Sequence, residues 1–538
     1  MSRENHGVPL EEMPAATVPP ALAGPREAVG RHGAAATGHP AASRAALEVL
    51  AAGGSVGDAA IAASAMLAVV LPHATSIGGD AFFLVRDAAT GQIQGLNASG
   101  RAPQAAAAGA FPEGLPQRGA RAAVVPGLVK GWEALHARLG CKAWDSLFDP
   151  AIRAAQEGFP VGPTLAQSIV ALESSLRADP GCAAAFFPAG MALAAGDTFR
   201  QEKLAETLAA IARNGAAIFY GGEVGRRLTG RVAAAGGFLR PGDLEGFTAD
   251  WVTPMTLAFG GHEIAVMPPN SYGVLMLMQL QALAALPVGE LAGDTVTRFR
   301  RQMRAMQAVF DTALEQVGDP AGMEWTNGSF LAESAMEEVR SRMLGERGGQ
   351  QPVPGGGTAC VTVADADGNA VCIVQSIFNP FGAHYLEPDT GIVLNNRLFG
   401  FDHRPGRVNA IGPGKRSAHT LNPVMVTQGG DLRWVYASPG GISQTITGVQ
   451  VLINLIVRRL GIGAAIDAGR WAVDRSRNIL LEPKLACDLL PALRAAGLDA
   501  RTEEDDYLFG SVTLIQRDPD RSLRAAGDAR RHAAAMAY

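Results

Sequence analysis

The sequence predicts an α+β fold made of two unlike halves. Apolar residues recur at helical spacing through most of the first half, with breaks at Gly and Pro. From Thr358 onward, short apolar runs with strand-like alternation dominate. Between the halves, Leu344–Pro354 is rich in Gly, Pro and charged residues, which is typical of an exposed linker. The chain has 538 residues and 48% hydrophobic content, so it can bury a large core.

The N-terminal segment predicts no ordered element. Residues 1–30 are rich in Pro, Ala and Glu and have no apolar run of the length that a signal peptide needs. We therefore expect a mobile tail on a cytoplasmic protein. The longest apolar stretch, Ala59–Leu71, is too short to span a membrane and is expected to be a buried helix.

Charge and cysteine usage exclude several classes of function. The 46 basic and 51 acidic residues are close to balance, and no Lys/Arg cluster indicates a nucleic-acid or membrane partner. The five cysteines form no CxxC pair, so neither a disulfide framework nor a zinc site is indicated. Cys360 and Cys372 lie in apolar segments and are expected to be core residues. No P-loop or HExxH motif is present, and we expect neither a metal nor a cofactor.

The helices of the first half are predicted from the helical spacing of apolar residues and from the Gly and Pro residues that interrupt it. The first helical pattern ends at Gly53-Gly54 and the second ends at Pro72. Two strand candidates, Ala81–Val85 and Gln92–Asn97, can pair across the Thr90-Gly91 turn. The predicted helices are His39–Ala51, Val56–Leu71, Gly127–Leu139, Leu147–Glu157, Gln201–Asn214, Gly222–Ala235 and Val296–Gln316.

Elements of the second half are mainly strands. One long apolar helix, Thr445–Leu460, is expected among them. The predicted strands are Thr358–Val363, Ala370–Ser376, Gly391–Leu394, Asn422–Val426, Arg433–Ala437 and Val512–Gln516.

Thr358 is the first candidate for chemistry, because three glycines, residues 355–357, lead directly into it. Glycine tolerates strained backbone, so the Thr358 hydroxyl could reach the Gly357 carbonyl and turn that peptide bond into an ester. Water would then split the chain between Gly357 and Thr358. The new α-amine has an ordinary pKa of about 7.7–8.0 and can act as the general base. The alternative is an ordinary Gly-rich linker before a strand.

A second hydroxyl is expected beside Thr358. The segment from Thr358 to Ser376 predicts a β-hairpin whose tip is Asp367-Gly368. Counting back from this tip places Ser376 or Ile377 opposite Thr358, within hydrogen-bonding reach of its hydroxyl or amine. The alternative is that Ser376 is an ordinary hydroxyl at a strand end.

The turn at residues 438–441, Ser-Pro-Gly-Gly, follows a predicted strand and precedes a predicted helix. Free N–H groups of Gly440 and Gly441 at a helix N-terminus would form an oxyanion site, although such a pair is usually only a turn. A GxSxG string occurs at residues 53–57, but it lies between two helical patterns. Ser55 is therefore expected to cap a helix and not to serve as a hydrolase nucleophile.

Further short segments occur in a fixed order along the chain. They are His39-Pro40, Ala51–Gly54, Asp58–Ala60, Val70–His73, Gly78–Asp80, Val125–Gly127, Met267–Ser271, Thr358, Asp367–Val371, Asn395-Asn396, Gly414–Arg416 and Ser438–Gly441. Together, and in this order, they resemble the gamma-glutamyltranspeptidase family of N-terminal-nucleophile hydrolases.

The resemblance implies a four-layer αββα sandwich and a precursor that is cut before Thr358. The products would be a heavy fragment, residues 31–357, and a light fragment, residues 358–538, which stay associated. It also implies that Thr358 is the nucleophile, that Ser376 supports it, and that Gly440 and Gly441 form the oxyanion pair.

Departures from the family concern the substrate. Residues that hold the glutamyl α-amine and α-carboxylate in gamma-glutamyl enzymes correspond here to Phe378, Arg397, Gly400, His419 and Thr420. The acidic partner for a substrate ammonium is thus absent from its usual position, whereas Arg397 offers a guanidinium to a carboxylate. Arg101 lies near the family's carboxylate-binding Arg. The alternative for Arg397 is a surface residue in a loop.

This pattern is similar to the branch of the family that includes oxamate amidohydrolases and cephalosporin-type acylases. We therefore expect an autoprocessed amidohydrolase acting on a small amide that carries a carboxylate, such as an oxamate-like or glutaryl-type compound. Assembly as a homo-oligomer stays open. Arg101, Arg397, His419 and Thr420 are the expected substrate-binding residues. Two alternatives stay open: a gamma-glutamyltransferase or glutathione hydrolase, and an unprocessed, non-catalytic member of the family.

Overall fold

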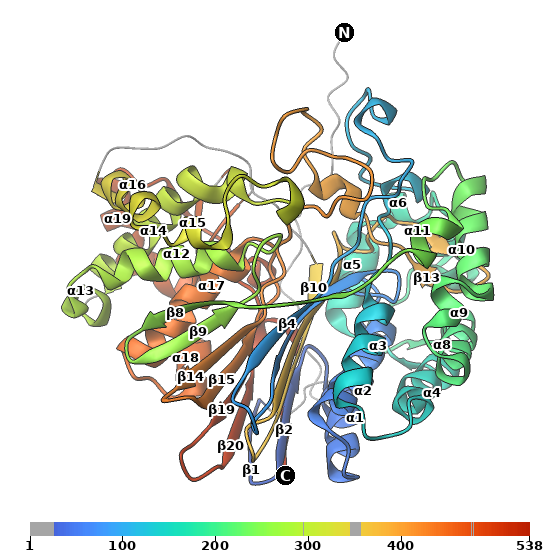
Figure 1. Cartoon of the computed structure of the whole chain (residues 1–538), viewed down its shortest axis with the longest axis horizontal. Helices are drawn as coiled ribbons and strands as arrows, with labels where there is room; N and C mark the ends of the chain where they lie inside the picture. Colours follow the sequence, from blue (N-terminus) through green and yellow to red (C-terminus); the bar gives the residue numbers. More distant parts are fainter. Residues whose placement is uncertain (1–25, 294, 345–356, 475, 477) are drawn as a thin grey trace.

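Two seven-stranded antiparallel sheets lie face to face at the centre of the molecule (Figure 1). The computed structural model describes residues 26–293, 295–344, 357–474, 476 and 478–538. The first sheet has the order β21 (Ala534–Ala537), β2 (Gly33–Thr37), β10 (Gly357–Asp365), β11 (Ala370–Phe378), β3 (Asp80–Arg86), β4 (Ile93–Ala98), β7 (Asp250–Val252). The second sheet has the order β1 (Glu27–Gly30), β20 (Leu523–Gly527), β19 (Thr513–Arg517), β15 (Asp431–Ala437), β14 (Val424–Gln428), β9 (His262–Val266), β8 (Met255–Phe259).

Helices cover the outer face of each sheet, which confirms the expected four-layer αββα sandwich (Figure 1). Those on the side of the first sheet are α1 (Pro40–Ala51), α2 (Val56–Val70), α3 (Leu128–Leu139), α4 (Asp149–Glu157), α5 (Pro163–Ala171), α6 (Glu173–Leu176), α7 (Pro180–Phe186), α8 (Glu202–Asn214), α9 (Ala217–Tyr220), α10 (Glu223–Ala234) and α11 (Pro241–Glu245). Those on the side of the second sheet are α12 (Gly273–Ala284), α13 (Val288–Ala292), α14 (Thr295–Ala313), α15 (Asn327–Phe330), α16 (Glu333–Leu344), α17 (Ser443–Leu452), α18 (Ile462–Asp467) and α19 (Pro483–Ala495).

Alternation along the central strands sorts their side chains between two cores. In β10, Val361 and Val363 pack toward the helices, whereas Cys360 and Ala364 pack toward the second sheet. Successive side chains of a strand point to opposite faces, so the even-numbered residues of β10 face the space between the sheets. Cys360 and Cys372 are both buried there, as the sequence predicted. Thr358 has the same parity as Cys360, and this places it on the side that faces the second sheet.

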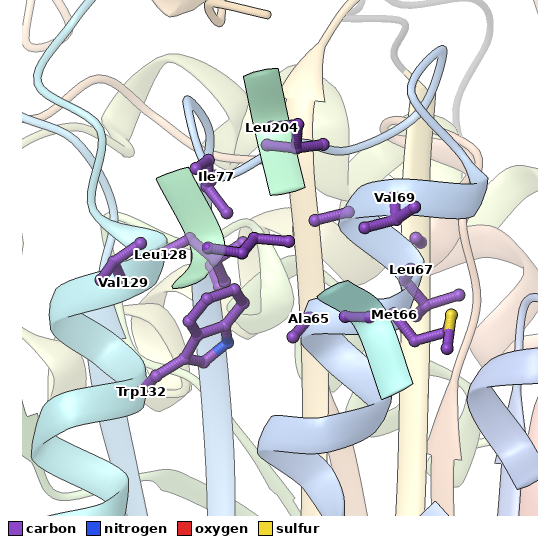
Figure 2. Close-up of a cluster of buried hydrophobic side chains, with 14 of the residues drawn as sticks. Ala65, Met66, Leu67, Val69, Ile77, Leu128, Val129, Trp132 and Leu204 are labelled. Carbon is purple, nitrogen blue, oxygen red and sulfur yellow. The ribbon is translucent and has the colours of Figure 1, made fainter. Parts of the chain in front are cut away.

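Helix α2 forms the centre of the outer core on the first sheet. It is buried along its whole length, and its N-terminus carries the predicted Ser55 cap, in which the side chains of Ser55 and Asp58 bond each other's backbone N–H groups. Figure 2 shows Met66, Leu67 and Val69 of this helix in a cluster that also contains Trp132 of α3. This packing holds α2 firmly against β10 and β11.

The predicted helices and the Thr358–Ser376 hairpin are confirmed, with boundaries shifted by a few residues. Helix Thr445–Leu460 differs, because α17 ends at Leu452 and residues Ile453–Val457 continue as a π-helical turn. Part of the predicted linker, residues 345–354, lies outside the described residues. No helix in the described parts of the chain is both long enough and apolar enough to cross a membrane.

Several strands of the first half were not predicted. The clearest are β1, β2, β8 and β9. Strand β1 lies inside the expected mobile tail, so that prediction is wrong for Glu27–Gly30, and residues 1–25 lie outside the described residues. The sequence of β2 is Gly-Ala-Ala-Ala-Thr, which has almost no intrinsic strand preference. It becomes a strand because β10 and β21 pair with it on either side. Both partners are hundreds of residues away in the chain.

Candidate active site

Thr358 is the second residue of β10, near the middle of the first sheet, and it is only 5% exposed. The pairing of β10 with β11 runs from Gly357 opposite Phe378 to Ala359 opposite Gln375, with an irregularity between them. One residue, Thr358, therefore stands opposite two, Ser376 and Ile377, which is the arrangement of a β-bulge. The predicted neighbourhood of Thr358 and Ser376 is confirmed by this register.

Ser376 contacts the peptide bond that precedes Thr358. Its Oγ donates a hydrogen bond of 2.6 Å to the carbonyl oxygen of Gly357 and accepts one of 2.7 Å from the N–H of Phe378. Phe378 has a φ of 81°, an uncommon backbone conformation for a non-glycine residue. A donor on the Gly357 carbonyl oxygen polarises the carbonyl and would stabilise negative charge on that oxygen during attack.

Gly440 and Gly441 form the turn between β15 and α17, with φ values of 126° and 59°. Among the described residues, neither glycine donates its N–H to a hydrogen bond. Gln444, in the first turn of α17, brings its Nε2 within 3.5 Å of the Thr358 Oγ. Two unused N–H groups thus lie at a helix N-terminus close to Thr358, where a developing oxyanion would be stabilised.

Arg397 is fully buried, with 1% of its side chain exposed, so the alternative of a surface arginine in a loop is wrong. Its Nη2 donates to the Oδ1 of Asp80 at 3.0 Å, and its Cζ lies 4.6 Å from the centre of the Phe378 ring. Its Nε and Nη1 have no hydrogen-bond partner among the described residues. Buried guanidinium N–H groups without partners are costly, and a substrate carboxylate would satisfy them.

Asp80 is a carboxylate of this site that the sequence analysis did not assign. It stands opposite Ser376 in the pairing of β3 with β11 and is fully buried. Its Oδ2 accepts hydrogen bonds from the Nε2 of His419 at 3.0 Å and from the N–H of Gly100 at 3.2 Å. Burial alone would raise the pKa of Asp80, but the charge of Arg397 and the bond from His419 hold that pKa well below its usual range.

The carboxylate that pairs with Arg397 belongs to Asp80, on a strand of the first half, and not to the position of Gly400. Asp80 directly precedes the predicted strand Ala81–Val85, but its pairing with β11 could not be read from the sequence.

His419 and Thr420 are both buried, at 1% and 2% exposure. The Nδ1 of His419 accepts a hydrogen bond from the N–H of Leu421, so the proton is on Nε2, which faces Asp80. Burial, followed by the nearby charge of Arg397, lowers the pKa of His419 to about 4. His419 is thus a neutral partner that orients Asp80.

Arg101 makes its polar contacts with groups outside this cluster. Its guanidinium bonds the carbonyl of Gly414 at 3.1 Å and the carboxylate of Asp250 at 3.3 Å, and 35% of its side chain is exposed. Asp250 is shared with the buried Arg416. Arg101 does not contact Asp80 itself, but its neighbour in the chain, Gly100, donates its backbone N–H to Asp80.

Within the described residues, no group of three or more His, Cys, Asp or Glu side chains has the geometry to hold a metal ion. The site as described consists of a threonine, a serine donor, two free N–H groups and a buried Asp–Arg–His cluster. A hydroxyl nucleophile and donors to a developing oxyanion are parts that acyl transfer uses.

Comparison with known proteins agrees with this geometry. A family model described as Gamma-glutamyltranspeptidase matches residues 42–538. The chain is 32% identical to the oxamate amidohydrolase proenzyme of Klebsiella pneumoniae, over 95% of this chain and 99% of that protein. It is 31% identical to the acylase ACY 1 proenzyme of Pseudomonas sp. (strain V22), over 93% of this chain and 92% of that protein.

A solved structure resembles the whole molecule. The crystal structure of a cephalosporin acylase from Bacillus halodurans superposes with a TM-score of 0.89 at 30% sequence identity, covering 100% of this chain and 99% of that chain.

Proposed function

The chain belongs to the gamma-glutamyltranspeptidase family and is an enzyme of that family; on this premise we propose that Thr358 is its nucleophile. In this proposal the protein cuts itself before Thr358 and then hydrolyses an amide of a small substrate that carries a carboxylate. The observation that carries the proposal is the hydrogen bond from Ser376 to the carbonyl of Gly357, next to a buried threonine.

The proposed self-cleavage takes place in the uncut chain, between neighbouring residues. The Thr358 Oγ attacks the Gly357 carbonyl carbon, the peptide C–N bond breaks, and an ester joins Gly357 to the Thr358 side chain. Water then hydrolyses the ester and leaves a carboxylate on Gly357 and an amine on Thr358. The fragments stay together because β2 of the heavy fragment pairs on one side with the light-fragment part of β10 and on the other side with β21 of the light fragment.

Substrate hydrolysis repeats this chemistry in two steps. The Thr358 Oγ attacks the amide carbonyl while the new α-amine takes its proton and passes it to the leaving amine. The N–H groups of Gly440 and Gly441 stabilise the oxyanion. Water then attacks the acyl ester, the bond to Oγ breaks and its oxygen regains a proton, and the free acid leaves.

The substrate class follows from Arg397. Its unpartnered Nε and Nη1 would bind a carboxylate on the acyl part of the substrate, while Asp80 fixes the guanidinium through Nη2. His419 and Thr420 line the same buried region, and Arg101 contributes positive charge at its edge. Oxamate-like and glutaryl-type amides meet this requirement. Relatives named as an oxamate amidohydrolase and as acylases support this class. We also propose a cytoplasmic location, on the sequence grounds given above.

Two measurements test the proposal. Intact masses and the N-terminal residue of the purified protein are expected to reveal a fragment that begins at Thr358, whereas Thr358→Ala should stay uncut and inactive. Turnover of oxamate and glutaryl-anilide should exceed turnover of gamma-glutamyl-anilide. Clear preference for the gamma-glutamyl compound would reject the substrate class, and normal turnover by Thr358→Ala would reject the mechanism.

A second candidate is a gamma-glutamyltransferase that acts on glutathione-like compounds. The observation that favours it is the Asp80 carboxylate, which could pair with a substrate ammonium if Arg397 moved aside. Dipeptide acceptors would then accelerate product release. If the purified chain is uncut and turns over none of these compounds, the protein is a non-catalytic member of the family.

A further inference from the structure

A serine hydroxyl away from Thr358 is hydrogen-bonded to a histidine, in a cluster that the proposed reaction does not use. The Oγ of Ser175 and the Nδ1 of His384 lie 2.6 Å apart, and the Nε2 of His384 lies 3.0 Å from the carbonyl oxygen of Pro380. Arg118 donates from its Nη1 to the same Oγ of Ser175, at 2.6 Å. We call Ser175, His384 and Arg118 the serine cluster.

The partners of the serine cluster decide where its protons are. A carbonyl oxygen only accepts hydrogen bonds, so the ring proton of His384 is on Nε2 and its Nδ1 carries a lone pair. The guanidinium of Arg118 only donates, so the hydroxyl proton of Ser175 points to that lone pair. A base that is itself oriented by a third group is the arrangement that activates a hydroxyl nucleophile.

The ring of His384 is uncharged and held in place. Burial, followed by the charge of Arg118, lowers the pKa of His384 to about 4, so the ring is neutral at pH 7. The backbone of His384 has a φ of 47° in a tight turn, in which its N–H donates to the carbonyl of Phe381 at 2.9 Å. The N–H of Gly119 donates to the carbonyl of Ala383, and this bond ties the segment of Arg118 to the same turn.

The serine cluster lies at the protein surface. Ser175 is half-buried in α6, and Arg118 is exposed. Within the described part of the chain, the guanidinium of Arg118 makes no hydrogen bond other than the one to Ser175. Its remaining N–H groups are therefore available to stabilise negative charge beside the Ser175 Oγ. A hydroxyl, a base and an anion-stabilising cation thus stand together where a small molecule can reach them.

We propose that Ser175 is a second nucleophile of this protein, which takes acyl groups from activated esters such as aryl esters. The proposal goes beyond the proposed function and does not depend on Thr358. The Ser175 Oγ attacks the ester carbonyl carbon, its proton passes to the Nδ1 of His384, and Arg118 stabilises the oxyanion. The bond between the carbonyl carbon and the phenol oxygen breaks, the phenol leaves with the proton from His384, and an acyl ester of Ser175 remains. Water then gives a proton to the same nitrogen, attacks the ester and releases the acid.

Labelling of the uncut Thr358→Ala chain with a fluorophosphonate tests the reactivity of Ser175 in the absence of the Thr358 hydroxyl. The serine oxygen displaces fluoride from phosphorus, and peptide mass spectrometry locates the stable adduct. Ser174 is an internal control, because it is the exposed neighbour of Ser175 in the same helix and its hydroxyl has no hydrogen-bond partner within the described residues. We expect Ser175 to react at least about 100-fold faster than Ser174. Equal labelling of the two serines, or no adduct on Ser175, would overturn the proposal.

Variants in the same background assign the reactivity to the serine cluster. Arg118→Met should slow the labelling of Ser175 by at least about tenfold, and His384→Gln by at least about 100-fold. Arg521→Met is the matched control for loss of a cation, because Arg521 is 69% exposed and lies in the loop between β19 and β20. Labelling of Arg118→Met at the rate of the Arg521→Met control would refute the assignment, even if His384→Gln does not fold.

Turnover of 4-nitrophenyl acetate tests the acyl transfer itself. We expect the uncut Thr358→Ala chain to release nitrophenolate, and Ser175→Ala to lower this rate by at least about tenfold. Ser174→Ala should leave the rate unchanged. Equal rates for Ser175→Ala and Ser174→Ala would contradict the proposal. Every protein in this comparison lacks the Thr358 hydroxyl, so failure here leaves the proposed function untouched, and failure of self-cleavage in the wild-type chain leaves the Ser175 result valid.

Discussion

The hydroxyl of Ser376 donates a 2.6 Å hydrogen bond to the carbonyl oxygen of Gly357, the residue on the far side of the proposed cleavage bond from Thr358. The bond exists because the bulge in the β10–β11 pairing sets Ser376 beside this peptide bond. Ser376 is thus placed to act on the carbonyl that Thr358 attacks in self-cleavage.

Removing this donor should slow self-cleavage. Loss of one preorganised donor to an oxyanion typically costs about 10²–10³ in rate. We expect Ser376→Ala to accumulate the uncut chain, measured as the rate at which the light fragment forms after synthesis. Ser376→Thr keeps the hydroxyl and is the matched control. Cleavage of Ser376→Ala at the wild-type rate would show that the bond has no role in the reaction.

The pair of Asp80 and Arg397 should be strongly coupled in stability. Both side chains are buried, so Asp80→Asn leaves the guanidinium charge uncompensated, at a cost of about 3–5 kcal/mol. Replacing both, as Asp80→Asn with Arg397→Met, should cost clearly less than the sum of the single changes. Urea unfolding of the four proteins in the uncut Thr358→Ala background measures the coupling. Additive effects would contradict the ion pair.

Stability should fall steeply in mild acid. His384 and His419 are buried, and burial is the main cause that lowers the pKa of each to about 4. The unfolded chain takes up these protons near pH 6.5 but the folded chain does not. Above about pH 6.5 these two groups do not change the free energy of unfolding. Between about pH 6.5 and pH 4 each group lowers it, by about 1.4 kcal/mol per pH unit.

Urea unfolding of the uncut Thr358→Ala chain between pH 7 and 4.5 measures this decline. His384 lies outside the proposed Thr358 site, where its ring bonds Ser175 and the carbonyl of Pro380. His384→Gln should reduce the slope of the free energy of unfolding against pH by the contribution of one histidine, and should leave the proposed chemistry of Thr358 unaltered. An unchanged slope in that variant would mean that His384 already binds a proton when folded.

The outer core on the first sheet should depend on Trp132. Its ring is fully buried in the cluster of Figure 2, and its Nε1 donates a 2.7 Å hydrogen bond to the hydroxyl of Ser64. Trp132→Ala is expected to lower the free energy of unfolding by about 3–5 kcal/mol. Val288→Ala, at a side chain that is 69% exposed, should change it by less than about 0.5 kcal/mol. Similar losses for both would argue against this packing.

Much of the architecture could be predicted from local signals. Gly and Pro breaks delimited α1 and α2, and the Asp367-Gly368 turn placed Ser376 opposite Thr358 within one residue. Strands without intrinsic preference were missed, and β2 is the clearest case. Its alanines adopt an extended form because neighbouring strands supply the hydrogen bonds.

By itself, the sequence determined the helices, the hairpin and the Gly357-Thr358 junction, since each depends on residues close together in the chain. The tertiary structure alone decided that Asp80 meets Arg397, 317 residues away, and that His39 meets His532 beside Thr358. The physical reason is that strand order and register between distant segments set these contacts. A buried guanidinium needs a carboxylate beside it, and the strand order decides which carboxylate is close enough to pair with it.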